Sequence, residues 1–321
     1  MDIAVIGAGM SAAGFYSRVS SMRVKFFDKG RGFGGRMSRR HIKNIGEFDH
    51  GAQFFTAREA SFKSLIEEAM KAGFIGEISG QVAYYKDNNK EEAREASRYY
   101  SKPANALVRY LLSDAEVRLS EKVVKIIECK DKLKLELESG KITEAFDMAV
   151  ISAPGPQAIE LCPESERPEN LDVRMEACFC TMLALKKGSY KLEEDAAFVK
   201  GRKLSWFASN TRKERSSVED CITLHSTPDF AKNYTPDDKL NFERELIEDF
   251  LSLTKINRAN ITHATSHFWR YARPQDETIK NEGFYLSKSK RIALIGDYLM
   301  GGRVEGAFLS GKKLAEAITR Y

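Results

Sequence analysis

The chain has 321 residues, of which 42% are hydrophobic and 30% charged, and 51 basic against 46 acidic residues give a formal net charge of +5. These values are typical of a soluble globular protein with one large domain or two ordinary ones. Basic and acidic residues are interleaved and no apolar run approaches the roughly 20 residues of a membrane helix, so we expect neither nucleic acid nor a membrane as a partner.

The first predicted element is a buried strand, Ile3 to Ile6, that leads through Gly7 into a helix. Gly7, Gly9 and Ala12 match the spacing G-x-G-x-x-G/A, in which the glycines allow a tight turn and let a pyrophosphate approach the backbone. A second apolar strand ends in Asp28, where this β-α-β motif places a carboxylate on the ribose hydroxyls. The sequence therefore predicts a bound dinucleotide, contacted by Gly7, Gly9, Met10, Ser11, Ala12 and Asp28.

Two glycine-containing segments follow the second strand. The first, Lys29 to Arg40, is rich in glycine and arginine, and Arg36 directly follows two glycines. A guanidinium matches phosphate geometry, so we expect Arg36 to meet the pyrophosphate. In the second segment, Gly51 and Ala52 allow the backbone to lie against a flat ligand.

The middle of the chain alternates between helical and strand patterns. Helices are predicted at 59–73, 103–112 and 236–254, and residues 86–98 are predicted to be a charged hairpin or loop. Strands are predicted at 81–85, 117–119, 123–128, 132–138 and 148–152. Further strands at 183–185, 197–199, 204–208 and 222–225 are expected to form an antiparallel sheet that walls a substrate cavity.

A further strand, residues 267–272, carries an unusual row of side chains. Alternation puts His267, Trp269 and Tyr271 on one face and Phe268 and Arg270 on the other. Such a row can stack on a planar heterocycle and hydrogen-bond to it, and it is equally compatible with ordinary core packing.

The closing segment indicates which dinucleotide is bound. A buried strand ends in Gly296 and Asp297, and a helix of small residues begins near Val304. Asp297 can contact ribityl or pyrophosphate oxygens. The helix N-terminus offers unpaired N–H groups and about half a positive charge, which favour the anion of a reduced flavin. This arrangement favours FAD over NAD.

Several stretches together resemble the renalase-like flavoproteins, a branch near the flavin amine oxidases. The matching stretches are residues 29–36, 48–53, 206–210, 224–228, 267–272 and 296–311. The resemblance extends over nearly the whole chain and implies an α/β fold: a Rossmann-type FAD-binding domain with an interleaved α+β substrate domain built on an antiparallel sheet. We expect the FAD-binding domain at 1–58, 101–157 and 286–321, and the substrate domain at 59–100 and 158–285.

The resemblance also implies further site residues. The Val123 backbone is expected to meet the adenine and Pro154 to approach the cofactor. The other expected cofactor contacts are Lys29, Met37, Gly51, Ala52, Gln53, Gly296, Glu305, Gly306 and Ala307. Substrate-site candidates are His267, Trp269, Tyr271 and Arg270, with Arg270 able to meet a phosphate or carboxylate.

The activity implied by the resemblance is oxidation of the 2- and 6-dihydro isomers of NAD(P)H. Their hydride would pass to flavin N5, and O2 would then reoxidise the flavin to give hydrogen peroxide and NAD(P)+. Two alternatives stay open: a flavin amine oxidase or desaturase acting on amines or other small reduced heterocycles, and a flavin-binding module without turnover.

The cysteines and histidines indicate whether disulfides or a bound metal are expected. The five cysteines are an odd number without a C-x-x-C pair, and none of the five histidines stands at metal-ligand spacing. We expect reduced cysteines and no bound metal. Because the first strand begins at residue 2, we expect no cleaved signal peptide and a cytoplasmic location.

Overall fold

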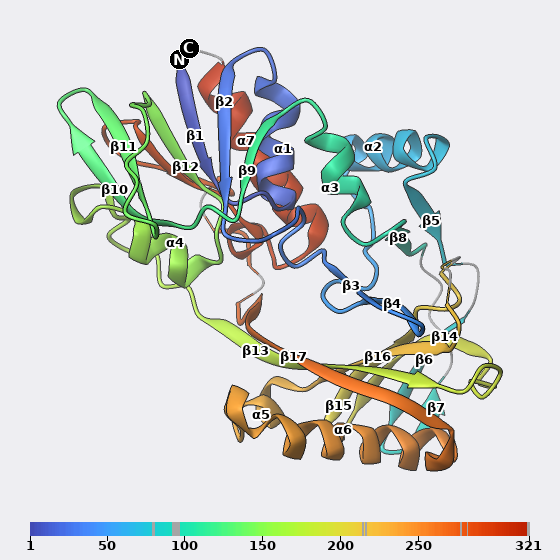
Figure 1. Ribbon diagram of the computed structural model, residues 1–321. Coiled ribbons are helices and arrows are strands. Elements are labelled where there is room, and N and C mark those ends of the chain that lie inside the picture. Colours follow the sequence, from blue (N-terminus) through green and yellow to red (C-terminus); the bar gives the residue numbers. More distant parts are fainter. Residues whose placement is uncertain are drawn as a thin grey trace.

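The computed structural model describes residues 1–78, 81–91, 97–213, 215, 217–276, 278–280 and 282–319. Figure 1 shows two sheets, one above the other, with the hairpin of β3 (Arg39–Ile42) and β4 (Gly46–Asp49) between them. The α/β architecture with two interleaved sheet regions confirms the predicted fold class.

The upper sheet has six strands in the order β18-β19-β12-β1-β2-β9. Only the pairing of β18 with β19 is antiparallel; the other neighbours are parallel. Its strands are β1 (Asp2–Ile6), β2 (Arg23–Asp28), β9 (Glu116–Leu119), β12 (Met148–Ile151), β18 (Tyr285–Leu286) and β19 (Ile292–Leu294). The predicted β-α-β unit is confirmed, with its central strand almost wholly buried as a doubly covered parallel sheet requires.

Helices α1 (Met10–Val19) and α7 (Val304–Thr319) pack closely against each other beside this sheet. Two glycines make the close approach possible. A Cβ on Gly14 would lie 2.1 Å from the Phe308 carbonyl oxygen, and one on Gly311 would lie 1.9 Å from that of Ser11. The first and last helices of the chain are thereby joined at the glycine-rich turn.

The lower sheet has seven strands in the order β17-β13-β16-β15-β14-β6-β7. They are β6 (Gln81–Lys86), β7 (Asn89–Glu91), β13 (Met175–Leu185), β14 (Glu194–Lys200), β15 (Leu204–Ser209), β16 (Asp220–Ser226) and β17 (Ile261–Pro274). The predicted antiparallel sheet is confirmed, and β6 joins its edge parallel to β14. β6 and β7 form a hairpin over residues 81–91, and of the segment 86–98 predicted as a charged hairpin or loop, residues 92–96 lie outside the described residues.

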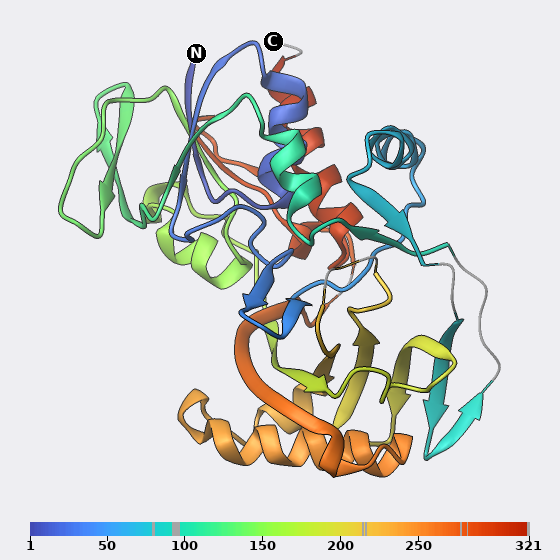
Figure 2. The ribbon, with the colours of Figure 1, turned by 45° about the vertical axis from the view of Figure 1, so that its right-hand side comes forward.

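Helix α6 (Lys239–Thr254) covers the outer face of the lower sheet, as Figure 2 shows. Phe250 and Phe242 pack into the sheet, with Phe242 stacked on Phe179 at 3.7 Å between ring centroids. The shorter helix α5 (Pro228–Ala231) lies beside it. With one face closed by α6, the other face of the sheet turns toward the β3–β4 hairpin, where Phe48 and Trp269 share a core cluster.

The remaining elements flank the upper sheet. They are α2 (Ala60–Lys71), β5 (Ile75–Glu77), β8 (Tyr99–Ser101), α3 (Ala106–Leu111), β10 (Val123–Cys129), β11 (Lys132–Leu137) and α4 (Gly155–Leu161). Phe62 of α2 contacts Phe308 of α7 at 5.3 Å between ring centroids, so α2 shares a core with the first sheet. The domain boundaries given above stay a prediction.

Two general properties follow from the described residues. None of their helices combines the length and apolarity needed to cross a membrane. All five cysteines are unpaired, as predicted.

Candidate cofactor and substrate site

In the turn between β1 and α1, glycines leave the backbone uncovered by side chains. Gly7 has φ +106°, and a Cβ there would lie 2.5 Å from the Ser152 carbonyl oxygen. Gly9 caps α1 without any side-chain hydrogen bond, and the nearest protein atom to a Cβ at Gly9 is the Gly34 oxygen at 4.0 Å. Gly35, with φ +55°, approaches Gly9 from the other side. The result is a cradle of open backbone with free first-turn N–H groups, which suits a pyrophosphate.

Asp28 lies at the end of β2, beside this cradle. Its two carboxylate oxygens accept the backbone N–H groups of Ala8 and Gly30, each at 2.6 Å. A carboxylate offers about four lone-pair sites, so two remain for ribose hydroxyls. The neighbouring Lys29 side chain is exposed. The cradle and Asp28 together fit the pyrophosphate and ribose of a dinucleotide.

Arg36 and Asp297, predicted separately, form a bidentate ion pair. The Arg36 guanidinium donates to the two Asp297 oxygens at 2.8 and 2.5 Å and to the Ala272 carbonyl oxygen at 3.0 Å. Asp297 is buried and Arg36 partly exposed. Three of the five guanidinium N–H donors are used, so two stay available to an anion. The pair ties the glycine-rich loop to the end of β17 and to the C-terminal region.

The segment 51–53 packs directly on Arg36. The Ala52 N–H donates to the Arg36 carbonyl oxygen at 2.8 Å, and a Cβ on Gly51 would lie 1.9 Å from that oxygen and 3.4 Å from the Trp269 ring. Only glycine fits between them. This contact brings the glycine-rich loop that carries Arg36 together with Trp269 of strand β17.

The N-terminus of α7 carries three more predicted residues. Glu305 is buried, and one of its carboxylate oxygens accepts the backbone N–H groups of Arg58 and Glu59, each at 2.7 Å. Gly306 allows the turn at Met300 to pack on the helix, because a Cβ would lie 2.3 Å from the Met300 oxygen. Ala307 follows, half-buried. Glu305 therefore anchors the chain that enters α2.

The other predicted cofactor residues lie around the same edge of the upper sheet. The Ser11 hydroxyl is 2.6 Å from that of Ser152, and the Gly296 N–H donates to the Ser310 hydroxyl at 2.9 Å. Val123 shares a core cluster with Phe27. Pro154 caps the N-terminus of α4. The residues Met10, Ala12 and Met37 are buried.

Below this edge, His50, His225, His267 and Trp269 form an imidazole–indole cluster. The His50 ring is stacked on Trp269 at 5.3 Å between centroids, and His267 meets Trp269 edge-on at 4.4 Å. The Trp269 indole N–H donates to the His50 carbonyl oxygen at 2.8 Å, and His225 Nε2 lies 3.4 Å from the same oxygen. The cluster unites the end of β4 with β16 and β17.

Burial keeps these imidazoles uncharged. It lowers the pKa of His50 to about 3, with the nearby imidazole of His267 adding to the effect. Burial likewise lowers the pKa of His225 to about 4. The pKa of His267 is lowered by burial and by the positive charge of Arg40. At neutral pH the side chains of the cluster are therefore aromatic and uncharged.

The two remaining substrate-site candidates, Arg270 and Tyr271, have no ring contact with the cluster among the described residues. Arg270 is exposed, and Phe268 on its side of the strand packs against Phe179 beneath the sheet. The register of β17 with β13 shifts just beyond Trp269, between the pairs Cys178–Trp269 and Glu176–Arg273. Tyr271 is half-buried.

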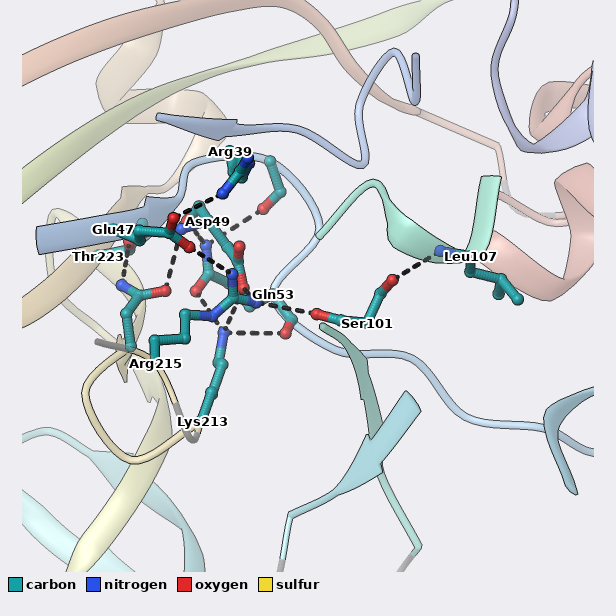
Figure 3. Close-up of polar contacts among 11 residues, drawn as sticks. Arg39, Glu47, Asp49, Gln53, Ser101, Leu107, Lys213, Arg215 and Thr223 are labelled. Atoms are coloured by element: carbon teal, nitrogen blue, oxygen red, sulfur yellow. Dashed lines mark hydrogen bonds and ion pairs between the residues drawn. The ribbon is translucent and has the colours of Figure 1, made fainter. Parts of the chain in front are cut away.

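A buried ion network supports the 49–53 segment, as Figure 3 shows. The Lys213 ammonium donates to Asp49 Oδ2 at 3.2 Å and to the backbone and side-chain oxygens of Gln53 at 3.0 and 3.1 Å. Arg215 donates to the same Asp49 oxygen at 2.7 Å and to the Ser101 carbonyl oxygen at 2.9 Å. The side chains of Asp49, Lys213 and Arg215 are at most 4% exposed. Two cations thus fix the loop that carries His50 and Gly51.

Sequence reasoning did not single out His50, Asp49, Lys213 or Arg215 as residues of the candidate site. His50 and Asp49 lie inside the 48–53 stretch and carried no spacing signal of their own. Lys213 and Arg215 belong to a charged stretch that has the composition of a surface loop. Their burial follows from contacts with residues more than 100 positions away, which no local pattern reveals.

The chain matches known families and folds over most of its length. The family model described as flavin containing amine oxidoreductase matches residues 50–319, and that of an NAD(P)-binding Rossmann-like domain matches residues 5–69. Among solved structures, a protein assigned as a protoporphyrinogen oxidase from Exiguobacterium sp. 255-15 is similar, with a TM-score of 0.75 and 11% identity. That match covers 99% of this chain and 98% of the other and shows a shared fold.

Proposed function

The chain belongs to the flavin containing amine oxidoreductase family and has FAD as its cofactor, and from this premise we propose that it is a renalase-like oxidase of dihydronicotinamide dinucleotides. Its substrates would be the 2- and 6-dihydro isomers of NAD(P)H. The glycine cradle, Asp28 and the two free donors of Arg36 hold the phosphates and ribose of the cofactor. The N-terminus of α7 lies at the same edge.

The observation that carries the proposal is the imidazole–indole cluster. Its stacked rings, His50 and Trp269, lie at 17° between ring planes, an arrangement to which a planar ring can add by stacking. Gly51 connects this surface to the cofactor side, because it contacts both Trp269 and Arg36. A neutral cluster stacks on an uncharged dihydropyridine, and its imidazoles add no positive charge beside the ring that becomes positive on oxidation.

The reaction balances without a further reagent. The substrate gives up one hydride and becomes NAD(P)+, and O2 with that hydride and one proton becomes hydrogen peroxide. FAD, when bound, accepts the two electrons and passes them to O2. The chain's own residues orient the ring and exclude water: Trp269 fixes the His50 backbone, and the Lys213 network fixes the loop below.

Anaerobic mixing tests this function. The FAD-loaded protein is mixed with each purified 2- and 6-dihydro isomer, with ordinary 4-dihydro NADH as the control. We expect the visible flavin absorbance to bleach rapidly with the isomers and slowly with the control, and to recover when air is admitted. One hydrogen peroxide and one NAD(P)+ should form per substrate consumed.

If the flavin stays oxidised with both isomers but bleaches with amines, the protein is an amine oxidase and the renalase-like assignment is wrong. A flavin that no donor reduces would indicate a binding module.

A further inference from the structure

Arg40 lies on the face of the β3–β4 hairpin that is turned toward the imidazole–indole cluster. In the hairpin, Arg40 pairs with Phe48 and Arg39 with Asp49. Directly opposed residues of an antiparallel pair share a face. Arg40 therefore lies on the side of Phe48, which packs with Trp269 in one core cluster. Arg39 lies on the opposite side, where it pairs with Glu47.

The charge of Arg40 acts on the imidazoles of the cluster, in agreement with its place on the Phe48 face of the hairpin. Its positive charge lowers the pKa of both His50 and His267, which come from different strands. Burial is the larger cause in both cases. The same guanidinium thus acts on both imidazoles.

Arg40 is half-buried yet has no hydrogen bond or ion pair with any residue that the structure describes. Other arginines near the site are satisfied: Arg36 by Asp297, Arg39 by Glu47, and Arg215 by Asp49. A partly desolvated guanidinium without an acceptor is costly, and an anion supplied by a ligand removes that cost.

We infer that Arg40 binds a phosphate of the substrate while the substrate's ring lies on the imidazole–indole cluster. This assignment rests on the proposed function and makes Arg40, in place of the exposed Arg270, the residue that selects a phosphate-bearing substrate. Among the described residues, Arg40 has no hydrogen bond or ion pair with the glycine cradle or with Asp297, the groups assigned above to the cofactor.

The test compares Arg40→Gln with the wild type on two substrates that differ only in phosphate: a dihydronicotinamide mononucleotide isomer and the corresponding riboside. A lost charged hydrogen bond corresponds to a 10- to 100-fold change. We expect KM for the mononucleotide to rise by that factor, kcat to change less than threefold, and the riboside kinetics to stay unchanged. Arg40→Lys should recover part of the loss.

Arg39→Gln is the matched control, because it removes the adjacent charge from the opposite face, and it should leave both substrates unaffected. The assignment would be overturned if Arg39→Gln raised KM for the mononucleotide as much as Arg40→Gln does. It would also be overturned if Arg270→Gln raised this KM and Arg40→Gln did not. A tenfold loss of FAD affinity in apoprotein carrying Arg40→Gln would overturn it as well, since the phosphate would then belong to the cofactor.

A binding measurement tests the role of Arg40 even if the proposed oxidase function is wrong. If the wild type oxidises no dihydronicotinamide, titration of the FAD-loaded protein with NAD+ and with nicotinamide riboside still decides the role of Arg40. A loss of NAD+ affinity on Arg40→Gln, with riboside affinity constant, supports it. Equal affinity of wild type and variant for NAD+ contradicts it.

Discussion

At the scale of single residues, burial decides which charges the site carries. His50 and His225 are held neutral because desolvation penalises their protonated forms. Asp49 keeps two cations beside it in an interior that water does not reach. The 49–53 segment therefore contacts both the uncharged imidazole–indole cluster, through His50, and the charged network, through Asp49.

The histidine pKa values predict acid sensitivity. The folded pKa of His225 is about 4 and that of His50 about 3, both below the unfolded value of about 6.5. The unfolded chain thus binds more protons between pH 6.5 and 4, and the free energy of unfolding falls as pH falls through this window. The contribution of His225 to this loss should reach about 2 kcal/mol at pH 4.5.

Urea unfolding at pH 7 and pH 4.5 measures this effect. The variant His225→Gln should show a smaller difference between the two pH values than the wild type. Equal differences would show that His225 titrates normally in the folded protein.

Lys213 offers a second prediction at this scale. Lys213→Met leaves Asp49 with Arg215 alone and removes both contacts to Gln53, so we expect a loss of about 2 to 3 kcal/mol in the free energy of unfolding. Weaker FAD binding should accompany it, because the 49–53 loop loses its support.

Lys203→Met is the matched control for Lys213→Met. Lys203 pairs with Glu245 on the surface, and its removal should change the free energy of unfolding by less than about 1 kcal/mol. If both lysine variants behaved alike in denaturant melts, the buried network would have no special role.

At the scale of elements, the crossing of α1 and α7 is the most constrained contact near the site. Gly311→Ala places a methyl group 1.9 Å from the Ser11 oxygen, in backbone that cannot move without shifting the glycine cradle. We expect a loss of about 3 kcal/mol or more in stability and a clear loss of FAD affinity.

Gly32→Ala provides the comparison for this crossing. A Cβ at Gly32 meets no atom within 4 Å, so the variant should unfold like the wild type. A Gly311→Ala protein with unchanged melting and FAD affinity would mean that the two helices separate more easily than their packing indicates.

Most elements could be predicted from the sequence because their signals are local. The turn at Gly7 and the helix beginning at Val304 follow from spacing within a few residues, and Asp28 follows from its place in the same β-α-β unit. The parallel pairing of β6 with β14 could not be predicted, since it joins segments more than 100 residues apart.

The site could be predicted only in part, for the same physical reason. Trp269 and His267 were found through alternation along one strand, whereas their partner His50 comes from a different element and is recognised only after folding. The pairing of Arg36 with Asp297 links residues 261 positions apart. Each was predicted as a cofactor contact, but their contact with each other was not.

At the scale of the whole molecule, the candidate site lies where two sheets meet, and it draws residues from both ends of the chain. The first turn, the Arg36 loop and the N-terminus of α7 gather at the edge of the upper sheet. A ligand that bridges them stabilises the folded state over the unfolded chain. At FAD concentrations 100 times the Kd, the gain should be about 2.7 kcal/mol.

Thermal unfolding of apoprotein and FAD-loaded protein checks this linkage. The melting temperature should rise with FAD concentration, and the single transition should stay cooperative. A melting temperature independent of FAD would indicate that the cofactor contacts only a locally folded part.

The most direct test of the central claim is a stopped-flow measurement of flavin reduction by the 6-dihydro isomer of NADH, in the wild type and in Trp269→Leu. We predict rapid bleaching in the wild type and a reduction at least tenfold slower in the variant, with FAD affinity within threefold. A wild-type flavin that stays oxidised, or a variant that reduces at the wild-type rate, would contradict the assignment of the imidazole–indole cluster to substrate.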